Sequence, residues 1–132
     1  MPDEQALNGL SLQQIEGDDW GEPPADATRL VRTAHELRHT PIGELDAEDL
    51  RLLITQRIGL DVLVPRTLTL LEQNPLLEGD FYPGDVLAAI LKVPPSYWSA
   101  NPTQLARIEH IIASLDTTDL EPDITVFRTR SN

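Results

Sequence analysis

The sequence of 132 residues contains no cysteine, and aromatic residues make up only 5% of it. Without cysteine, a disulfide framework, a thiolate nucleophile and a cysteine-type zinc site are excluded. Because aromatic side chains are scarce, the core must be aliphatic, and a hydrophobic content of 40% is enough to build one. The apolar runs are far shorter than the roughly 18 residues that span a bilayer. The N-terminal residues also lack the features of a secretory signal, so we expect a cytoplasmic protein without membrane contact.

Basic residues are also few. The chain carries 10 lysine and arginine residues against 22 acids, which gives a formal net charge of −12. A field of this sign repels phosphate backbones and disfavours direct binding to nucleic acid, whereas it suits a basic partner. The length fits one domain, so we treat residues 1–132 as a single unit.

The spacing of apolar residues predicts an all-α bundle of five to six short helices. Residues 1–25 are acidic and are expected to form a loop or arm, apart from one turn at 11–16 that Ser11 and Gln14 would cap. Helical periodicity then predicts helices over 26–39, 46–59, 64–74, 83–92 and 101–115. The β-branched segment 124–127 has no partner strand, so we expect residues 122–132 to form an extended tail docked on the bundle.

Particular residues fix the expected ends and faces of these helices. In the 26–39 helix, Leu30 and Val31 belong to the apolar face. Asp46 is the expected N-cap of the next helix, and Gly59 is its expected stop. Pro65 is placed in the first turn of the third helix, where its missing N–H costs nothing. The 83–92 helix is expected to be amphipathic.

One catalytic motif is present, because residues 35–39 spell H-E-x-x-H. On a helix, His35 and His39 could share a zinc ion while Glu36 activates the bound water. Zinc needs a third protein ligand, and nothing marks the best-placed acid, Glu72, as that ligand. The alternative is that His39 is a helix C-terminal residue and His35 a surface side chain. We predict no catalytic residue, metal or cofactor, with a zinc peptidase as the alternative.

Two segments combine acids with aromatic residues. Residues 76–85 (LLEGDFYPGD) hold three acids beside Phe81 and Tyr82. Either the two aromatic side chains fill the edge of the core while Asp80 or Asp85 caps the next helix, or the loop presents carboxylates and an aromatic to a partner. Residues 18–24 (DDWGEPP) form the second segment, in which Trp20 is expected to pin the arm to the bundle with the acids outside.

These segments carry a resemblance to a known family. The pieces are LxxIExxxWGxP at 12–23, LRxxPI at 37–42, EDLRLLI at 48–54 and NPLxEGDFYPGDxL at 74–87. Their order and spacing over about residues 12–98 resemble the immunity proteins of contact-dependent growth inhibition systems. H-E-x-x-H does not belong to this pattern.

The resemblance implies an inhibitor rather than an enzyme. Proteins of this kind act in the bacterial cytoplasm, where they bind a C-terminal toxin domain delivered by a neighbouring cell, often a nuclease. The net charge supports the same partner independently, because a nuclease carries a basic groove for phosphates that attracts an acidic protein.

The toxin-binding residues expected from these arguments are the acids and the tyrosine of the two segments: Asp18, Asp19, Glu22, Glu78, Asp80, Tyr82 and Asp85. If these residues serve the fold instead, the contacts would come from other exposed acids such as Glu44, Asp46 or Asp61. A helical adaptor for a different partner is the third hypothesis. The sequence leaves the oligomeric state open.

Overall fold

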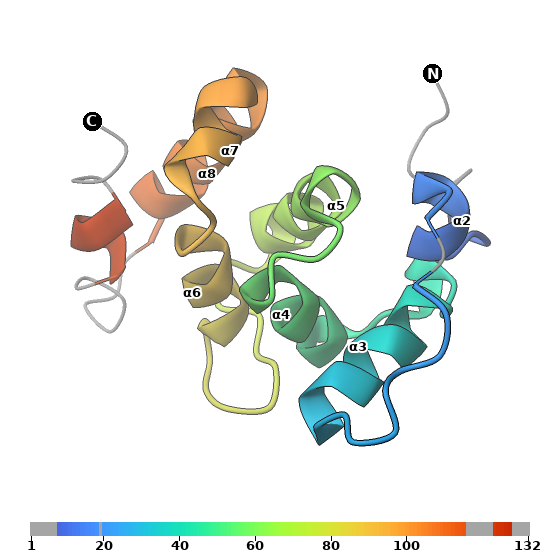
Figure 1. The fold of residues 1–132 in the computed structure, drawn as a ribbon. Helices are drawn as coiled ribbons and strands as arrows, with labels where there is room; N and C mark the ends of the chain where they lie inside the picture. Colours follow the sequence, from blue (N-terminus) through green and yellow to red (C-terminus); the bar gives the residue numbers. More distant parts are fainter. Residues whose placement is uncertain (1–7, 19, 116–122, 128–132) are drawn as a thin grey trace.

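A computed structural model describes residues 8–18, 20–115 and 123–127, and within them the chain is all-α, as predicted (Figure 1). Five described helices have seven residues or more: α3 (Arg29–Arg38), α4 (Ala47–Thr55), α5 (Leu60–Gln73), α6 (Asp85–Leu91) and α8 (Pro102–Ala113). The shorter ones are α2 (Leu12–Glu16), the 3₁₀ turn η1 (Ile42–Glu44), α7 (Pro95–Ala100) and a turn at residues 123–127. No described helix is long and apolar enough to span a bilayer.

Two helices begin at the capping residues that the sequence indicates. The Gln14 N–H donates to Ser11 Oγ, and the Ser11 N–H donates to Gln14 Oε1 (2.9 Å). At α4, Asp46 and Asp49 exchange the same pair of bonds, at 2.8 and 3.0 Å. Each cap satisfies two backbone donors that a helix start leaves without a partner, so local sequence alone determines both starts.

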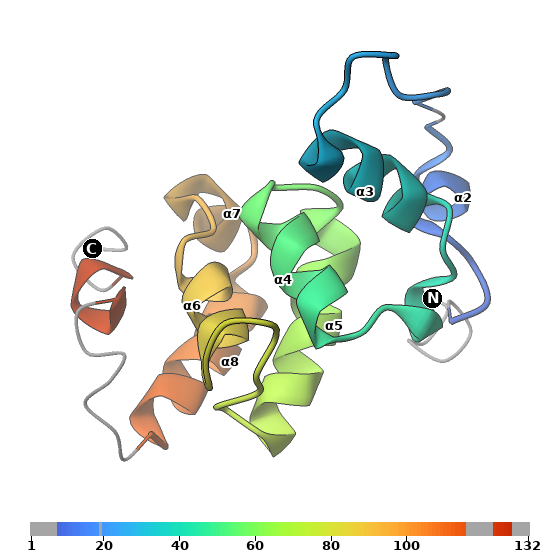
Figure 2. The ribbon, with the colours of Figure 1, turned by 90° about the horizontal axis from the view of Figure 1, so that it is seen from below.

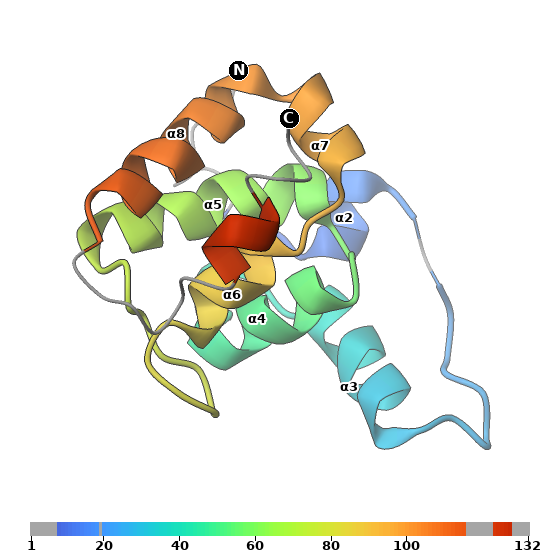
Figure 3. The same cartoon turned by 90° about the vertical axis from the view of Figure 1, so that its left-hand side faces the viewer.

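Helix α6 lies at the centre of the bundle. All seven of its residues are buried, so the predicted amphipathic character is wrong. One side packs against α4, and the turn at 123–127 crosses the other side (Figure 3). A helix covered on every side has no face left for solvent, and its sequence, DVLAAIL, is apolar after the first residue.

Of the predicted C-terminal tail, residues 122 and 128–132 lie outside the described residues, and the described part is docked as predicted but is helical rather than extended. Residues 123–127 form a helical turn that buries Ile124 and Phe127. The Phe127 ring lies edge-on to Trp98, with ring centroids 5.7 Å apart. Residues three apart share one face of a helix but point to opposite faces of an extended chain, so only the helix buries both side chains at once.

The junction between α4 and α5 also differs from the prediction. Helix α4 ends at Thr55 with Gln56 as its C-cap, and Gly59 is the N-cap of α5 rather than the stop of α4. Gly59 has a φ of +65°, and a Cβ there would lie 2.8 Å from Leu12 Cδ2, so both backbone and packing require glycine. Since α5 starts at Leu60, Pro65 lies inside the helix and not in its first turn.

Two further differences from the prediction concern α7 and α3. Helix α7 was missing from the prediction; Pro95 occupies its start, and it buries Tyr97 and Trp98. In α3, the expected apolar face is only partly buried, because Leu30 and Val31 remain 42% and 39% exposed. The first turn of α3 extends away from the bundle, and among the described residues no other helix covers Leu30 and Val31 (Figure 3).

The docked C-terminal turn yields a matched test of stability. We expect Phe127→Ala to lower the free energy of unfolding by about 3 kcal/mol, because it empties a buried aromatic site. Val126, in the same turn, is 55% exposed, and Val126→Ala should change stability by less than about 0.5 kcal/mol. Urea denaturation followed by circular dichroism measures both, and equal midpoints for the two variants would show that the turn adds nothing to the core.

Candidate functional site

The chain between α5 and α6 folds back on itself. Glu78 and Pro83 form an antiparallel bridge, and the Gly84 N–H donates to the carbonyl oxygen of Leu76 (3.1 Å). The loop therefore closes at its base and projects from the bundle, with residues 79–82 at its tip (Figures 1 and 3). We call residues 76–85 the acidic loop.

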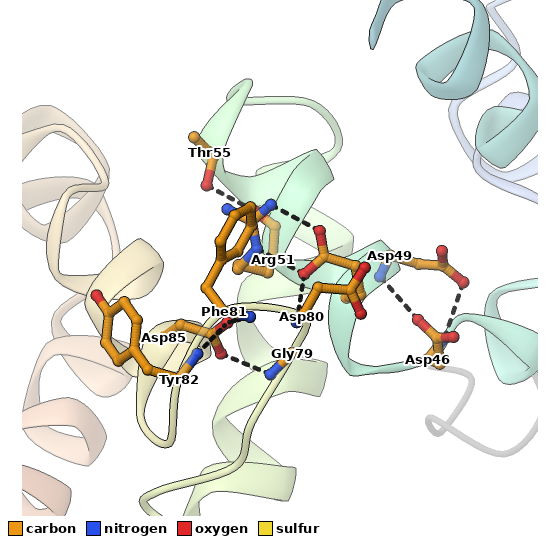
Figure 4. Close-up of polar contacts among 10 residues, drawn as sticks. Asp46, Asp49, Arg51, Thr55, Gly79, Asp80, Phe81, Tyr82 and Asp85 are labelled. Carbon is orange, nitrogen blue, oxygen red and sulfur yellow. Dashed lines mark hydrogen bonds and ion pairs between the residues drawn. The ribbon is translucent and has the colours of Figure 1, made fainter. Parts of the chain in front are cut away.

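A buried carboxylate holds the tip of the acidic loop. Asp85 is only 4% exposed, and its two carboxylate oxygens accept hydrogen bonds from the backbone N–H groups of Gly79 (2.6 Å) and Phe81 (3.0 Å) (Figure 4). A buried charge is tolerated only where such donors surround it. Asp85, the first residue of α6, thus holds the loop that precedes this helix.

A second carboxylate, from α4, holds the same tip from the other side. Glu48 Oε1 accepts from the backbone N–H of Asp80 (3.0 Å). The carboxylate also forms a two-pronged ion pair with Arg51, through Nε (2.7 Å) and Nη2 (2.6 Å). Because Asp80 is 32 residues away along the chain, this contact ties the loop to α4.

Gly79 lets these two carboxylates approach the backbone. A Cβ at this position would lie 2.7 Å from Glu48 Oε1 and 3.1 Å from Asp85 Oδ2. The first contact is shorter than a Cβ allows and the second is tight, so any side chain at residue 79 would displace the Glu48 carboxylate from its position. The loop tip is therefore held by the carboxylates of Asp85 and Glu48, and Gly79 leaves room for both.

The fixed loop exposes its two aromatic side chains. Phe81 is 67% exposed and Tyr82 is 44% exposed, so the expectation that they fill the edge of the core is wrong. The Arg51 guanidinium lies 4.5 Å from the centre of the Phe81 ring, within the range of a cation–π contact. Beside these residues is a hollow of about 240 Å³ whose lining includes Thr55 and Lys92.

The structure also separates the acids of this loop by role. The side chains of Glu78 and Asp80 are exposed. Asp85 is buried and serves the loop, although not as a helix cap, since Gly84 is the N-cap of α6 and makes no side-chain capping bond. Three of the four expected loop residues, including Tyr82, are therefore available on the surface.

The N-terminal arm forms a separate group. Trp20 packs edge-on against His35, with ring centroids 5.3 Å apart, and its ring lies 4.3 Å from the Arg38 guanidinium. Arg38 is buried, forms an ion pair with Glu16 and donates to the carbonyl oxygen of Asp18 (2.6 Å). Trp20 thus fastens the arm to α3, as the sequence predicts.

The acids of the arm are not brought together with those of the loop. Asp18 and Glu22 are exposed, and Asp19 lies outside the described residues. The arm runs along α3, whereas the acidic loop lies beside α4 and α6 (Figure 3). Of the alternative acids, Glu44, Asp46 and Asp61 are exposed as well, although the Asp46 carboxylate is occupied in capping α4.

The H-E-x-x-H residues lie at the end of α3 and contact the backbone. His39 is the C-cap, with Nδ1 2.8 Å from the His35 carbonyl oxygen, and His35 Nδ1 is 3.3 Å from the Gly21 carbonyl oxygen. Glu72 pairs instead with Arg107 of α8 (2.8 Å). In the described part of the chain, no three His, Cys, Asp or Glu residues are grouped as metal ligands.

Glu48 and Arg51 are site residues that the sequence does not reveal. Their spacing of three residues on a helix indicates an ion pair with each other. Nothing local indicates that the pair also contacts the loop at residues 80 and 81, because that contact requires α4 and the loop to be packed together. Long-range hydrogen bonds of this kind can be found only in the folded structure.

The buried carboxylate gives a direct test of how the loop is held. We expect Asp85→Ala to lower the free energy of unfolding by about 2 kcal/mol, because the N–H groups of Gly79 and Phe81 lose a charged acceptor. Asp80→Ala removes an exposed carboxylate and should change stability by less than about 0.5 kcal/mol. Urea titrations compare the two variants, and an unaltered midpoint for Asp85→Ala would contradict the assigned role.

Glu48 predicts a specific dependence on pH. The hydrogen bond from Arg51 holds the pKa of Glu48 below its ordinary value of 4.5. Because the pKa of Glu48 is lower in the folded protein than in the unfolded chain, its ionised carboxylate stabilises the fold at pH values above the unfolded-state pKa. This contribution is lost as the pH falls through the folded-state pKa. We therefore expect the stability difference between wild type and Glu48→Gln to shrink as the pH falls below 4.5. Thermal melts from pH 7 to pH 3 measure it, and a difference independent of pH contradicts the ion pair.

The comparisons with known proteins agree with the earlier resemblance. A family model described as CDI immunity proteins matches residues 14–108, which is more than half of the chain and includes α3, the acidic loop and the part of the arm from residue 14 onward. Comparison with individual curated proteins gives no match. Proteins of this family are non-catalytic inhibitors, so the chain is not an enzyme. The chain belongs to the family of contact-dependent growth inhibition (CDI) immunity proteins.

Proposed function

We propose that this protein binds and neutralises the toxin domain of its own CDI system in the cytoplasm, and that this toxin is a nuclease with a basic substrate groove. The observation that carries the proposal is the acidic loop, which holds two aromatic side chains in solvent on a fixed backbone. Proteins of this family bind a cognate toxin domain, so the binding role itself follows from membership.

The geometry of the acidic loop suits a binding surface. Exposed aromatic side chains dominate the energy of many protein interfaces, and Phe81 and Tyr82 are both exposed here. Because Asp85 and Glu48 already hold the loop, little conformational entropy is lost when a partner binds. We add Phe81 to the proposed contact residues and assign Asp85 to holding the loop.

The charge of the chain favours a basic toxin. A net charge of −12 attracts a phosphate-binding groove over a long range and repels the nucleic acid that competes for it. Four of the proposed contact acids, Asp18, Glu22, Glu78 and Asp80, are exposed and can meet lysine or arginine side chains. An adaptor for a neutral or acidic partner would gain nothing from this charge.

Co-expression with the toxin domain of the same CDI system tests the proposal. We expect a 1:1 complex that abolishes nuclease activity and weakens as salt is raised, because exposed charges are screened. Isothermal titration calorimetry at two salt concentrations, with a nuclease assay on the same samples, measures both properties. A toxin that stays active in the presence of excess protein would contradict the proposed function.

Charge reversal tests the contact acids. We expect Asp80→Lys to raise the dissociation constant about tenfold, since it opposes basic groups of the toxin. Glu109→Lys changes the net charge equally on an exposed position of α8 and serves as the matched control, with an expected change below about twofold. If reversal at Asp18, Glu22, Glu78 and Asp80 together leaves the affinity unaltered, the contacts lie elsewhere.

A further inference from the structure

The outer end of α3 presents an apolar surface that the fold leaves uncovered. Leu30 and Val31 continue the apolar face that Ala34 and Leu37 bury further along the helix, yet they are 42% and 39% exposed. Trp20 is 42% exposed and lies against His35 and Arg38. Residues 31, 35 and 38 share one helix face, so Trp20 borders the same surface. We call Trp20, Leu30 and Val31 the α3 patch.

The α3 patch and the acidic loop belong to the same side of the molecule. In Figures 1 and 3, the first turn of α3 and the tip of the loop both project downward from the bundle, and α4 lies between them. The view from that side shows the loop and α3 on opposite flanks of α4 (Figure 2). A partner that binds the loop and is large enough to extend across α4 therefore also contacts α3.

We propose that the toxin domain contacts both surfaces at once, with the α3 patch as a second apolar anchor beside Phe81 and Tyr82. This inference rests on the proposed function. A specific protein complex buries about 800 Å² on each partner and involves about 20–30 residues a side. The ten residues of the acidic loop cannot supply such an area, so a stable complex needs a second contact region on the same side.

The net charge identifies the toxin, rather than a second copy of this chain, as the occupant. Two copies that each carry −12 repel one another, whereas a basic domain is attracted. Exposed acids are present at both places, with Glu78 and Asp80 on the loop and Glu22 and Asp26 on the arm. Arg29 and Arg32, which flank Leu30 and Val31 in the sequence, are exposed as well, so the charge beside the α3 patch is mixed. Apolar anchors with a charged rim are the usual composition of a specific interface.

Substitution of the exposed apolar side chains tests the second anchor. We expect Leu30→Gln combined with Val31→Gln to raise the dissociation constant for a catalytically inactive toxin domain at least about tenfold. The matched control is Val126→Gln, which makes the same exchange at a 55% exposed residue of the C-terminal turn, at the opposite end of the bundle from the arm (Figure 1). Its affinity should change by less than about twofold.

A second measurement needs no substitution. The chain contains two tryptophans, of which Trp20 is exposed and Trp98 is buried. When this protein is labelled with 5-fluorotryptophan and the toxin is unlabelled, the fluorine spectrum reports these two positions alone. We expect toxin binding to shift the Trp20 resonance and to leave the Trp98 resonance in place.

The outcomes separate this inference from the proposed function. If wild-type protein does not bind the toxin, the proposed function fails. If wild type binds but the double variant binds equally well and Trp20 does not shift, the function stands and the second anchor is wrong. A concentration-dependent dimer of the free protein that the double variant abolishes would assign the patch to a second copy and overturn the inference.

Discussion

Helix α6 is buried on every side, and the rest of the structure depends on that constraint. The loop before it must bring the chain from the surface into the core at Asp85, whose charge cannot remain there without donors. The backbone N–H groups of Gly79 and Phe81 supply them, which curls the loop around the carboxylate. The shape of the acidic loop is therefore a consequence of how deeply α6 is buried.

The same arrangement separates structural acids from acids that can bind a partner. Asp85 and Glu48 use their oxygens to hold the loop backbone, while Glu78 and Asp80 remain in solvent. A binding surface of this kind needs a fixed backbone that carries exposed contact residues. Asp85 accepts from backbone N–H groups, and Glu48 adds one backbone bond to its ion pair with Arg51, so both hold the loop while the side chains of its tip remain exposed.

Local signals predicted the starts of α2 and α4 correctly, but the start of α5 and the burial around several helices wrongly. The reciprocal cap at Ser11 and the N-cap at Asp46 involve groups within three residues, so the sequence reveals them. Gly59 was misjudged because glycine suits the end of one helix and the start of the next equally well. The turn at 123–127 was misjudged because its β-branched residues favour a strand, whereas burial against Trp98 favours a helix.

Composition and periodicity were enough to establish an acidic, aliphatic, all-α chain, since each property is a sum over residues or a pattern within one helix. The acid-rich loop and the pinning role of Trp20 could also be found in this way. The sequence could not show which apolar residues stay exposed to solvent, because the burial of a side chain depends on whether another element packs against it. Leu30 is exposed because α3 extends past its neighbours, and Phe81 is exposed because the carboxylates of Asp85 and of the distant Glu48 hold the loop outward.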